Sequence, residues 1–194
     1  MSDAVLGLTG VVMAGGLSSR MGRDKALLKL ASGRTLLEQA VETLKHVGAK
    51  EVLVSVAHGK SYRLPGVREV ADVNEDCGPI GGLAACVDAA REPFCLVLAV
   101  DLPAMTSDYL RGLATMIGEK FGVVPINDGS AEPLSAIYPK AALAEIQRAI
   151  NERQFSLQRL AINLERSGLV RFAPVGAHEQ PLFANWNSPE DCRL

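Results

Sequence analysis

The sequence has few cysteines and almost no net charge, and each shortage excludes a class of protein. Its four cysteines (Cys77, Cys86, Cys95 and Cys192) show no C-x-x-C spacing, so neither a structural zinc site nor a disulfide scaffold is expected. The formal net charge is −2, which provides no general attraction to a nucleic-acid backbone or an anionic membrane surface. We therefore expect neither nucleic acid nor a membrane as a partner.

Long apolar runs are missing as well. No segment approaches the ~20 consecutive apolar residues that span a bilayer. The first ten residues, MSDAVLGLTG, have no basic stretch followed by an apolar one, as a signal peptide would. These absences predict a cytoplasmic protein. With 194 residues, 48% of them hydrophobic and 22% charged, the simplest organisation is one globular domain over residues 1–194.

Short apolar runs alternate with helical patterns along the chain. This alternation predicts an α/β fold with a mostly parallel sheet and helices on both faces. In such sheets ligands bind beyond the carboxyl ends of the strands. The expected strands are residues 8–13, 51–56, 67–71, 94–100, 121–126, 134–138 and 169–172, and the expected helices begin near 35, 79, 106, 139 and 156.

A glycine-rich stretch, GVVMAGGLSSRMGRDK, covers residues 10–25 and follows directly from the first expected strand. Five residues separate Gly16 from Gly22, and Lys25 lies three further on, so the Walker A spacing G-x-x-x-x-G-K is not met. Gly15 and Gly16 are adjacent, so the dinucleotide fingerprint G-x-G-x-x-G is not met either. Neither of the two commonest phosphate-binding loops describes this stretch.

The residue types in this stretch still suit a phosphate group. Adjacent glycines have no Cβ to block a ligand, and their backbone N–H groups are free to face an anion. Arg20 provides a fork-shaped cation and Lys25 a point charge, which suit different phosphates of one polyphosphate. A strand-ending turn with solvated charges is the alternative. We favour the phosphate site because glycines and both cations occur together after a buried strand.

Asp101 follows the most apolar expected strand, in AVDLP. A carboxylate at a strand end suits Mg²⁺, which takes few protein carboxylates together with phosphate oxygens of the substrate. The alternative is a turn or capping residue, a frequent role of aspartate. A cationic loop at the same edge of the sheet favours the metal site.

A second glycine segment, CGPIGGL, follows Asp72 and begins an expected helix. Free N–H groups and the positive dipole at a helix start attract an anion or a base edge. Gly81 and Gly82 weaken a helix, which suggests that another group approaches closely there. Packing against the sheet would also explain them, and Asp72 could equally be a solvated loop acid.

These segments together resemble the molybdenum cofactor guanylyltransferases. The stretch VVMAGGLSSRMGRDKALL is similar to that family's glycine-rich loop, L-A-G-G-x-S-x-R-M-G-x-D-K. In order along the chain, EDCGPIGGL, AVDLP, EPLSAIY and FANWNSPED are similar to four further family motifs. The resemblance implies a three-layer α/β/α, Rossmann-like nucleotidyltransferase fold with a mostly parallel, twisted sheet.

The resemblance also implies a reaction. GTP and the molybdopterin-bound molybdenum cofactor would give the guanine dinucleotide and pyrophosphate, with Mg²⁺ as cofactor. The nucleophile would be the terminal phosphate of molybdopterin, which is already ionised and needs no general base. The three histidines, which fall in no catalytic pattern, agree with this. Transient contacts with cofactor-synthesis and molybdoenzyme-maturation proteins would follow from the family's role.

The family roles transfer to this sequence by position. The catalytic residues would be Arg20, Lys25 and Asp101, with Asp101 also binding the metal. Asn185 and Asn187 would bind molybdopterin. Ser55 stands where some relatives have asparagine. The GTP-binding residues would be Met13, Ala14, Gly15, Gly16, Lys25, Ser55, Asp72, Gly78, Gly82 and Asp101.

Two other functions are open to the sequence. One is a related nucleotidylyltransferase that uses CTP or acts on a sugar phosphate. Those relatives tend to have A-A-G after the first strand, whereas this chain has Ala14-Gly15-Gly16. The other is a GTP-binding sensor domain without turnover. The joint presence of Arg20, Lys25 and Asp101 argues for catalysis, since binding alone needs fewer of them.

Overall fold

One eight-stranded sheet runs through the part of the chain that the structure, a computed structural model, describes: residues 7–15, 24–72 and 75–186. Its strands are β1 (Leu8–Met13), β2 (Glu51–Val56), β3 (Arg68–Ala71), β4 (Phe94–Ala99), β5 (Gly122–Asn127), β6 (Ser130–Ala131), β7 (Ile137–Pro139) and β8 (Val170–Pro174). Their order is β3-β2-β1-β4-β7-β5-β6, and β8 pairs with β5 outside that path. The chain therefore begins at the centre of the sheet and extends to both sides.

The first four strands are parallel and end at one edge of the sheet. Within the ladder Met13 pairs with Ser55 of β2 and with Ala99 of β4. β3 pairs with β2 in the same direction. The residues that follow these strands consequently emerge side by side, although they are far apart in the sequence.

The other half of the sheet is mixed. β7 lies between β4 and β5 and is antiparallel to both. β6 is also antiparallel to β5, whereas β8 is parallel to it. The core of the sheet is thus mostly parallel, as predicted, and the antiparallel strands are additions to it. The strand direction of β7 is not visible in sequence periodicity, and β6 has only two residues.

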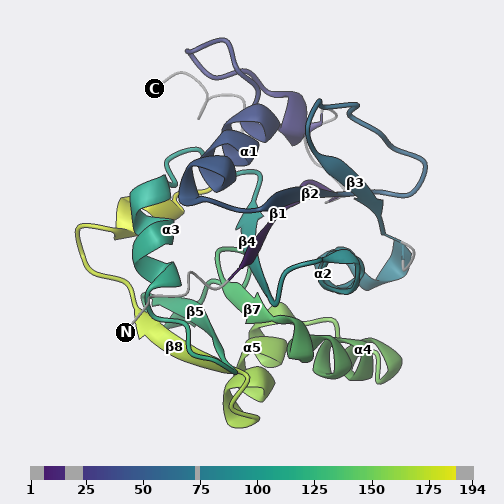
Figure 1. Ribbon diagram of the computed structural model, residues 1–194, viewed down its shortest axis with the longest axis vertical. Coiled ribbons are helices and arrows are strands. Elements are labelled where there is room, and N and C mark those ends of the chain that lie inside the picture. Colours follow the sequence, from purple (N-terminus) through teal and green to yellow (C-terminus); the bar gives the residue numbers. More distant parts are fainter. Residues whose placement is uncertain (1–6, 16–23, 73–74, 187–194) are drawn as a thin grey trace.

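Helices cover both faces of the sheet (Figure 1). α1 (Leu36–Val47) and α3 (Ser107–Ala114) pack on one face. α2 (Pro79–Ala89), α4 (Leu143–Asn151) and α5 (Leu157–Arg166) pack on the other. Short 3-10 turns complete the chain: η1 (Lys25–Leu27), η2 (Glu75–Cys77), η3 (Lys140–Ala142) and η4 (Gln180–Phe183).

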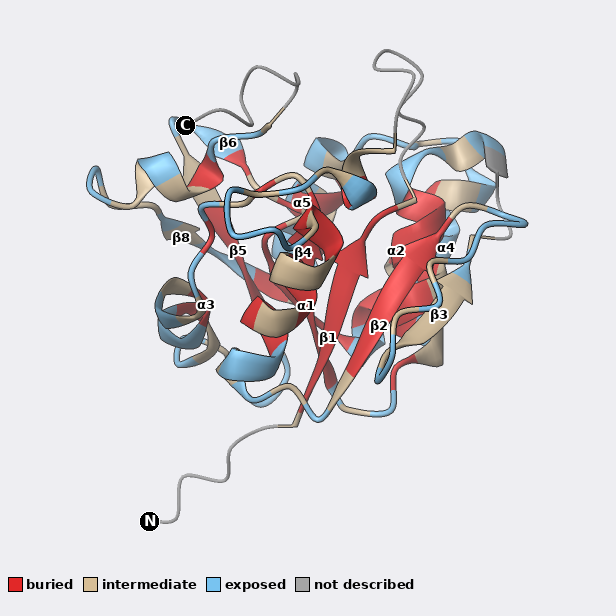
Figure 2. Ribbon diagram, turned by 90° about the horizontal axis from the view of Figure 1, so that it is seen from above, coloured by how far each residue is buried: buried red, intermediate tan, exposed pale blue. Residues whose placement is uncertain are grey.

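Alternation along the strands produces two hydrophobic cores. On β1, Val12 points into the core under α1, while Val11 and Met13 point into the core under α2. The apolar strand β4 is buried over its whole length. Figure 2 shows the buried residues concentrated in the central strands and on the inner sides of the helices. The predicted helices on both faces of the sheet are confirmed.

Local capping residues set the helix starts. Thr35 Oγ1 accepts a hydrogen bond from the Glu38 amide at 3.1 Å, and Glu38 accepts one from the Thr35 amide at 2.7 Å. Thr106 caps α3 and Ser156 caps α5 through the first of these two bonds alone, since their hydroxyls accept from the amides of Tyr109 and Arg159. The expected helix near 139 begins as the turn η3 and becomes regular only at Leu143.

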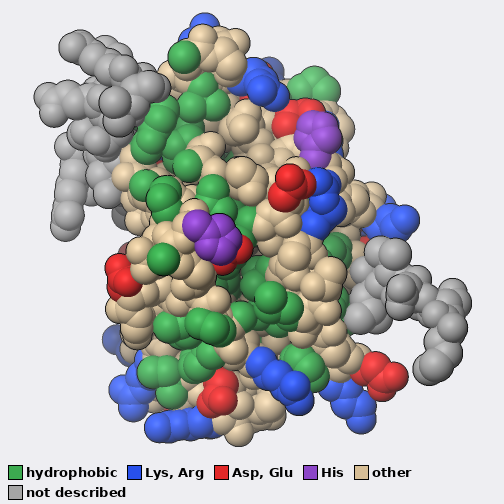
Figure 3. Space-filling model, turned by 90° about the vertical axis from the view of Figure 1, so that its left-hand side faces the viewer, with side chains coloured by type: hydrophobic (Ala, Val, Ile, Leu, Met, Phe, Trp, Pro, Cys, Tyr) green, Lys and Arg blue, Asp and Glu red, His purple; other side chains and the backbone are tan. Residues whose placement is uncertain are grey.

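No helix in the described ranges is both long and apolar enough to cross a membrane. Figure 3 shows the face that carries α3 and the η4 segment, where acidic, basic and hydrophobic side chains are interspersed.

Gly122 begins β5 where that strand meets β7, and it leaves no room there for a side chain. A Cβ at this position would overlap the backbone carbonyl of Ile137 on β7, and backbone cannot move aside as a side-chain end can. We expect Gly122→Ala to lower the free energy of unfolding by about 2–3 kcal/mol in urea denaturation. Gly112→Ala is the control, because nothing lies within 4 Å of a Cβ there.

The control, Gly112→Ala, lies in helix α3 and should raise the free energy of unfolding by roughly 0.5–1 kcal/mol, because alanine favours a helix more than glycine does. Equal stability of Gly122→Ala and the wild type would contradict this close contact of β5 with β7.

Candidate active site

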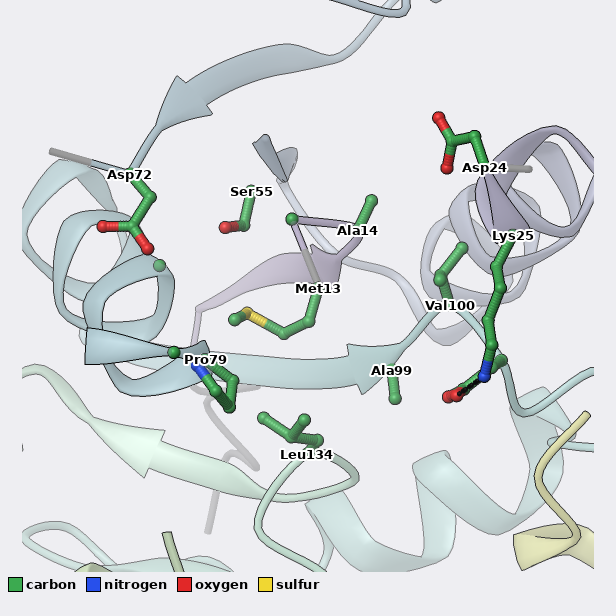
Figure 4. A pocket seen from close by; sticks show the side chains of 14 residues that line it. Met13, Ala14, Asp24, Lys25, Ser55, Asp72, Pro79, Ala99, Val100 and Leu134 are labelled. Atoms are coloured by element: carbon green, nitrogen blue, oxygen red, sulfur yellow. Dashed lines mark hydrogen bonds and ion pairs between the residues drawn. The ribbon is translucent and has the colours of Figure 1, made fainter. Parts of the chain in front are cut away.

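A cavity of about 250 Å³ opens where the parallel strands end. Strands β1, β2 and β4 contribute residues at their carboxyl ends, and α2 contributes its first turn. This is the edge at which an α/β sheet binds ligands. The lining residues are Met13, Ala14, Gly15, Asp24, Lys25, Ser55, Asp72, Gly78, Pro79, Gly82, Ala99, Val100, Asp101 and Leu134 (Figure 4).

The structure brings the predicted nucleotide-site residues together. Each of them that falls in the described ranges lines this one cavity: Met13, Ala14, Gly15, Lys25, Ser55, Asp72, Gly78, Gly82 and Asp101. Gly16, Arg20 and Asn187 lie outside the described residues. Their predicted roles are therefore carried by the sequence alone.

An ion pair between Lys25 and Asp101 occupies one side of the cavity. Lys25 Nζ lies 3.1 Å from Asp101 Oδ2, and the two side chains are 20% and 24% exposed. Lys25 extends from η1 toward the end of β4, where the dashed line in Figure 4 marks the contact. A cation and an anion thus stand together at the mouth of the cavity, each accessible to a charged ligand.

The opposite side is formed by Asp72 and the start of α2 (Figure 4). The Asp72 amide donates to the carbonyl of Val56 at 2.9 Å, which continues the strand pairing to the end of β3. Its carboxylate lies against α2, where a Cβ on Gly81 would be only 2.6 Å from Asp72 Oδ1. Glycine at position 81 therefore permits the close approach of this carboxylate to the helix.

Ser55 lies at the floor of the cavity and is 1% exposed. A Cβ on Gly82 would overlap Ser55 Oγ, so this second glycine admits the hydroxyl. Within the described part of the chain the hydroxyl has no oxygen or nitrogen partner and neighbours the Cys86 thiol, a weak hydrogen-bonding group. A buried hydroxyl without a strong partner costs about 1–3 kcal/mol, and a polar ligand atom in the cavity would satisfy it.

The buried cysteines contribute packing and no nucleophile. Burial, assisted by the neighbouring Cys95, raises the pKa of Cys86 to about 12. Burial likewise raises the pKa of Cys95 to about 12. Both thiols stay protonated at neutral pH, and a thiol in that form is a poor nucleophile.

The C-terminal segment reaches the same edge of the sheet. Phe183 is buried and meets the Tyr109 ring edge-on at 5.4 Å between centroids. Beyond it, the Trp186 amide donates to the backbone carbonyl of Asp101 at 2.9 Å. Asn185 is exposed and does not line the cavity, but its neighbour is bonded to Asp101. The segment thus lies beside the cavity on the Asp101 side.

Five residues that line the cavity were not predicted from the sequence. Asp24 is the charged residue among them. It directly precedes Lys25 in the sequence, and this position next to a predicted phosphate-binding cation could have indicated that Asp24 lies at the site. It caps η1, since its Oδ1 accepts from the Ala26 amide at 3.1 Å. The remaining missed residues are apolar and carry no chemical signal: Pro79, Ala99, Val100 and Leu134.

Helices cover both faces of a largely parallel sheet, and Gly15, Lys25 and the strand-end carboxylate of Asp101 line one cavity. This is the architecture of a nucleotidyltransferase. The chain belongs to the MobA-like NTP transferase family, because the model of that domain matches residues 10–185.

Relatives of nearly equal length agree. The chain is 36% identical over 194 residues to a protein of Opitutus terrae named "Probable molybdenum cofactor guanylyltransferase", covering 98% of this chain and 96% of the relative. It is 35% identical over 192 residues to the "Molybdenum cofactor guanylyltransferase" of Xanthomonas euvesicatoria pv. vesicatoria, covering 94% and 90%. The solved molybdopterin-guanine dinucleotide biosynthesis protein A from Archaeoglobus fulgidus is similar with a TM-score of 0.72, at 26% identity and 95% coverage of each chain. The predicted family, fold class and enzyme class are confirmed.

The close contact between Gly82 and Ser55 can be tested by protein stability alone, without any substrate. Gly82→Ala should lower the free energy of unfolding by about 1–3 kcal/mol, because the new methyl group overlaps Ser55 Oγ. Ser55→Ala removes the overlapping atom and leaves contacts of 3.3 Å to Met13 Cε and 3.5 Å to Ser55 Cβ. The double variant should therefore be more stable than Gly82→Ala alone. Strictly additive effects in urea denaturation would contradict the contact.

Proposed function

We propose that the chain transfers GMP from GTP to the terminal phosphate of the molybdopterin-bound molybdenum cofactor, giving molybdopterin guanine dinucleotide and pyrophosphate. The observation that carries this proposal is the Lys25–Asp101 pair at the mouth of a cavity beyond the carboxyl ends of parallel strands. The names of the relatives support guanine as the base and the molybdenum cofactor as the acceptor.

The shape of the cavity suggests how GTP is held. The triphosphate would lie on the Lys25 side, next to the backbone of residues 13–16 and the predicted phosphate ligand Arg20. The nucleoside would extend toward Asp72 and the first turn of α2, which includes Gly78 and Gly82. The Ser55 hydroxyl, buried and without a strong partner, would contact the nucleotide from the floor.

The chemistry requires alignment and charge stabilisation. An oxygen of the acceptor phosphate attacks the α-phosphorus of GTP, a new P–O bond forms, and the bond from the α-phosphorus to the bridging oxygen of pyrophosphate breaks. The attacking oxygen is already ionised at neutral pH, so no side chain has to remove a proton. Lys25 stabilises the charge that develops on the departing pyrophosphate, and the walls of the cavity hold the reactants in line.

Mg²⁺ fits the residues at this site. Among the described residues, no group of three or more His, Cys, Asp or Glu side chains could enclose a metal ion. Mg²⁺ needs no such group, since it binds through one or two carboxylates plus phosphate oxygens of the substrate. Asp101 would hold it, and when bound it would neutralise charge on the phosphates. Lys25 lies 3.1 Å from one carboxylate oxygen of Asp101, and both residues line the cavity.

The C-terminal segment would receive the acceptor. The bond from the Trp186 amide to the Asp101 carbonyl ties this segment to the edge where the reaction takes place. Asn185 is exposed there, and we assign it, together with Asn187, to the pterin substrate. Transient contacts with cofactor-synthesis and molybdoenzyme-maturation proteins are part of the same proposal, because a labile cofactor must be received and delivered.

Pyrophosphate release tests the proposal. The purified protein is incubated with Mg²⁺, molybdenum cofactor and each nucleoside triphosphate in turn, and GTP should give the fastest release. Lys25→Ala and Asp101→Ala should each reduce the rate by about 100-fold or more, since each removes a charge from the transition-state environment. Lys45→Ala is the matched control, because Lys45 forms a surface ion pair with Glu42 at 3.2 Å on α1. It should leave the rate unchanged.

Any of three results would refute the proposal. Release with CTP only, or with a sugar phosphate as the acceptor, would assign the protein to another branch of the nucleotidyltransferases. Tight binding of GTP without release of pyrophosphate would identify a nucleotide sensor.

A further inference from the structure

Tyr62 contacts the glycine-rich stretch at two places. It lies in the connection between β2 and β3, and its hydroxyl is 3.4 Å from the carbonyl oxygen of Ala14 and 3.3 Å from Asp24 Oδ1. Ala14 follows β1 directly, and Asp24 immediately precedes η1. A single phenol hydroxyl from a different part of the chain therefore lies between the residues that flank the stretch 15–23, and the two acceptors share its one proton.

Lys60, from the same connection, holds the other oxygen of this carboxylate. Its Nζ lies 2.6 Å from Asp24 Oδ2 and 5.2 Å from the centroid of the Tyr62 ring. The Asp24 side chain is only 17% exposed. A partly buried carboxylate next to the predicted triphosphate position is thereby neutralised by a cation that is not part of the cavity.

The connection between β2 and β3 is itself held in place. Glu69 Oε1 on β3 accepts hydrogen bonds from the amides of Tyr62 at 2.8 Å and Arg63 at 2.7 Å. Arg63 has a backbone φ of 52°, a left-handed conformation that costs a non-glycine residue about 1 kcal/mol or more. The surrounding hydrogen bonds maintain this conformation, and it directs the Tyr62 ring toward Asp24.

Asp24 transmits this contact to Lys25. Its Oδ1 accepts from the Ala26 amide at 3.1 Å and so caps the turn that carries Lys25. Figure 4 shows the two side chains leaving this turn in opposite directions, with Lys25 pointing to Asp101. The contacts therefore run from Tyr62 and Lys60 through Asp24 and η1 to the cation at the mouth of the cavity.

The Tyr62 hydroxyl remains a donor at every pH at which the protein would work. Burial, followed by the negative charge of Asp24, raises the pKa of Tyr62 above its usual value. Neither Tyr62 nor Lys60 lines the cavity. Their effect on a bound nucleotide is consequently indirect.

We propose that Tyr62, supported by Lys60, is a positioning residue for Lys25, which it acts on by fixing Asp24 and the turn η1. This inference rests on the proposed function, in which Lys25 binds the triphosphate. It adds the connection between β2 and β3 to the machinery of the reaction, at a place with no phosphate-binding pattern in its sequence.

Tyr62→Phe tests the inference, because it removes the hydroxyl and keeps the ring. We expect kcat with GTP to fall roughly 10-fold, the size of a lost hydrogen bond to a charged group, with a smaller change in KM. Tyr109→Phe is the control, since Tyr109 is also half-buried and its hydroxyl makes no hydrogen bond within the described ranges. It should leave kcat unchanged. A wild-type kcat in Tyr62→Phe would overturn the inference.

A double-mutant cycle separates positioning from loss of stability. In the Lys25→Ala background, Tyr62→Phe should cost less than about twofold, because its target is gone. The full loss in that background would overturn the inference, since Tyr62 would then act by another route. Lys60→Met should also lower kcat, and Lys60→Arg should restore it. All rates are measured well below the thermal midpoint of each variant.

An NMR measurement on the free protein decides the question independently of any substrate. The resonances of the Lys25 ε-methylene group, assigned with Lys25→Arg, should shift in Tyr62→Phe and stay in place in Tyr109→Phe. If the wild type releases no pyrophosphate from GTP, the proposed function fails while this measurement still tests the positioning. Unshifted Lys25 resonances in Tyr62→Phe would refute the positioning even if GTP is turned over.

Discussion

The parallel pairing of β1 with β2 and β4 is the constraint on which the whole site depends. The ladder sets Met13 beside Ser55 and Ala99, so three segments that are distant in sequence leave the sheet at one place. The ion pair from Lys25 to Asp101, 3.1 Å long, joins two of these exits. The two hydrophobic cores maintain this arrangement. They bury alternate residues of the strands on each face of the sheet, and a one-residue shift in strand pairing would expose those residues.

Close approach shapes the remainder of the cavity. Gly81 and Gly82 occupy the first turn of α2, where side chains would collide with the Asp72 carboxylate and the Ser55 hydroxyl. The helix gives up intrinsic stability at these positions, and the tertiary structure compensates by burying most of α2 against the sheet. Polar atoms can thus stand near the positive end of the helix dipole without a layer of side chains between them. The site is consequently a product of packing as much as of polar chemistry.

Family membership and geometry support the functional argument in different ways. The family match and the relatives establish a nucleotidyltransferase. The geometry adds that the predicted nucleotide ligands in the described ranges line one cavity, which motif order alone could not guarantee. It also adds contacts that the motifs do not reveal. Lys60 and Tyr62, which lie outside the motifs, hold Asp24, and the Trp186 amide is bonded to the Asp101 carbonyl.

The sequence by itself determined the α/β class, the strands from β1 to β4 and the capped starts of α1, α3 and α5, because these depend on local periodicity, capping chemistry and residue type. Thr35 with Glu38, and the apolar run of β4 before Asp101, are examples. The site residues stay a prediction, which rests on residue type and on the family resemblance. Only the tertiary structure decided the antiparallel direction of β7, the reason for Gly81 and Gly82, and the contact of Tyr62 with Asp24. These depend on which distant segments meet, and periodicity along one segment carries no information about its neighbours in space.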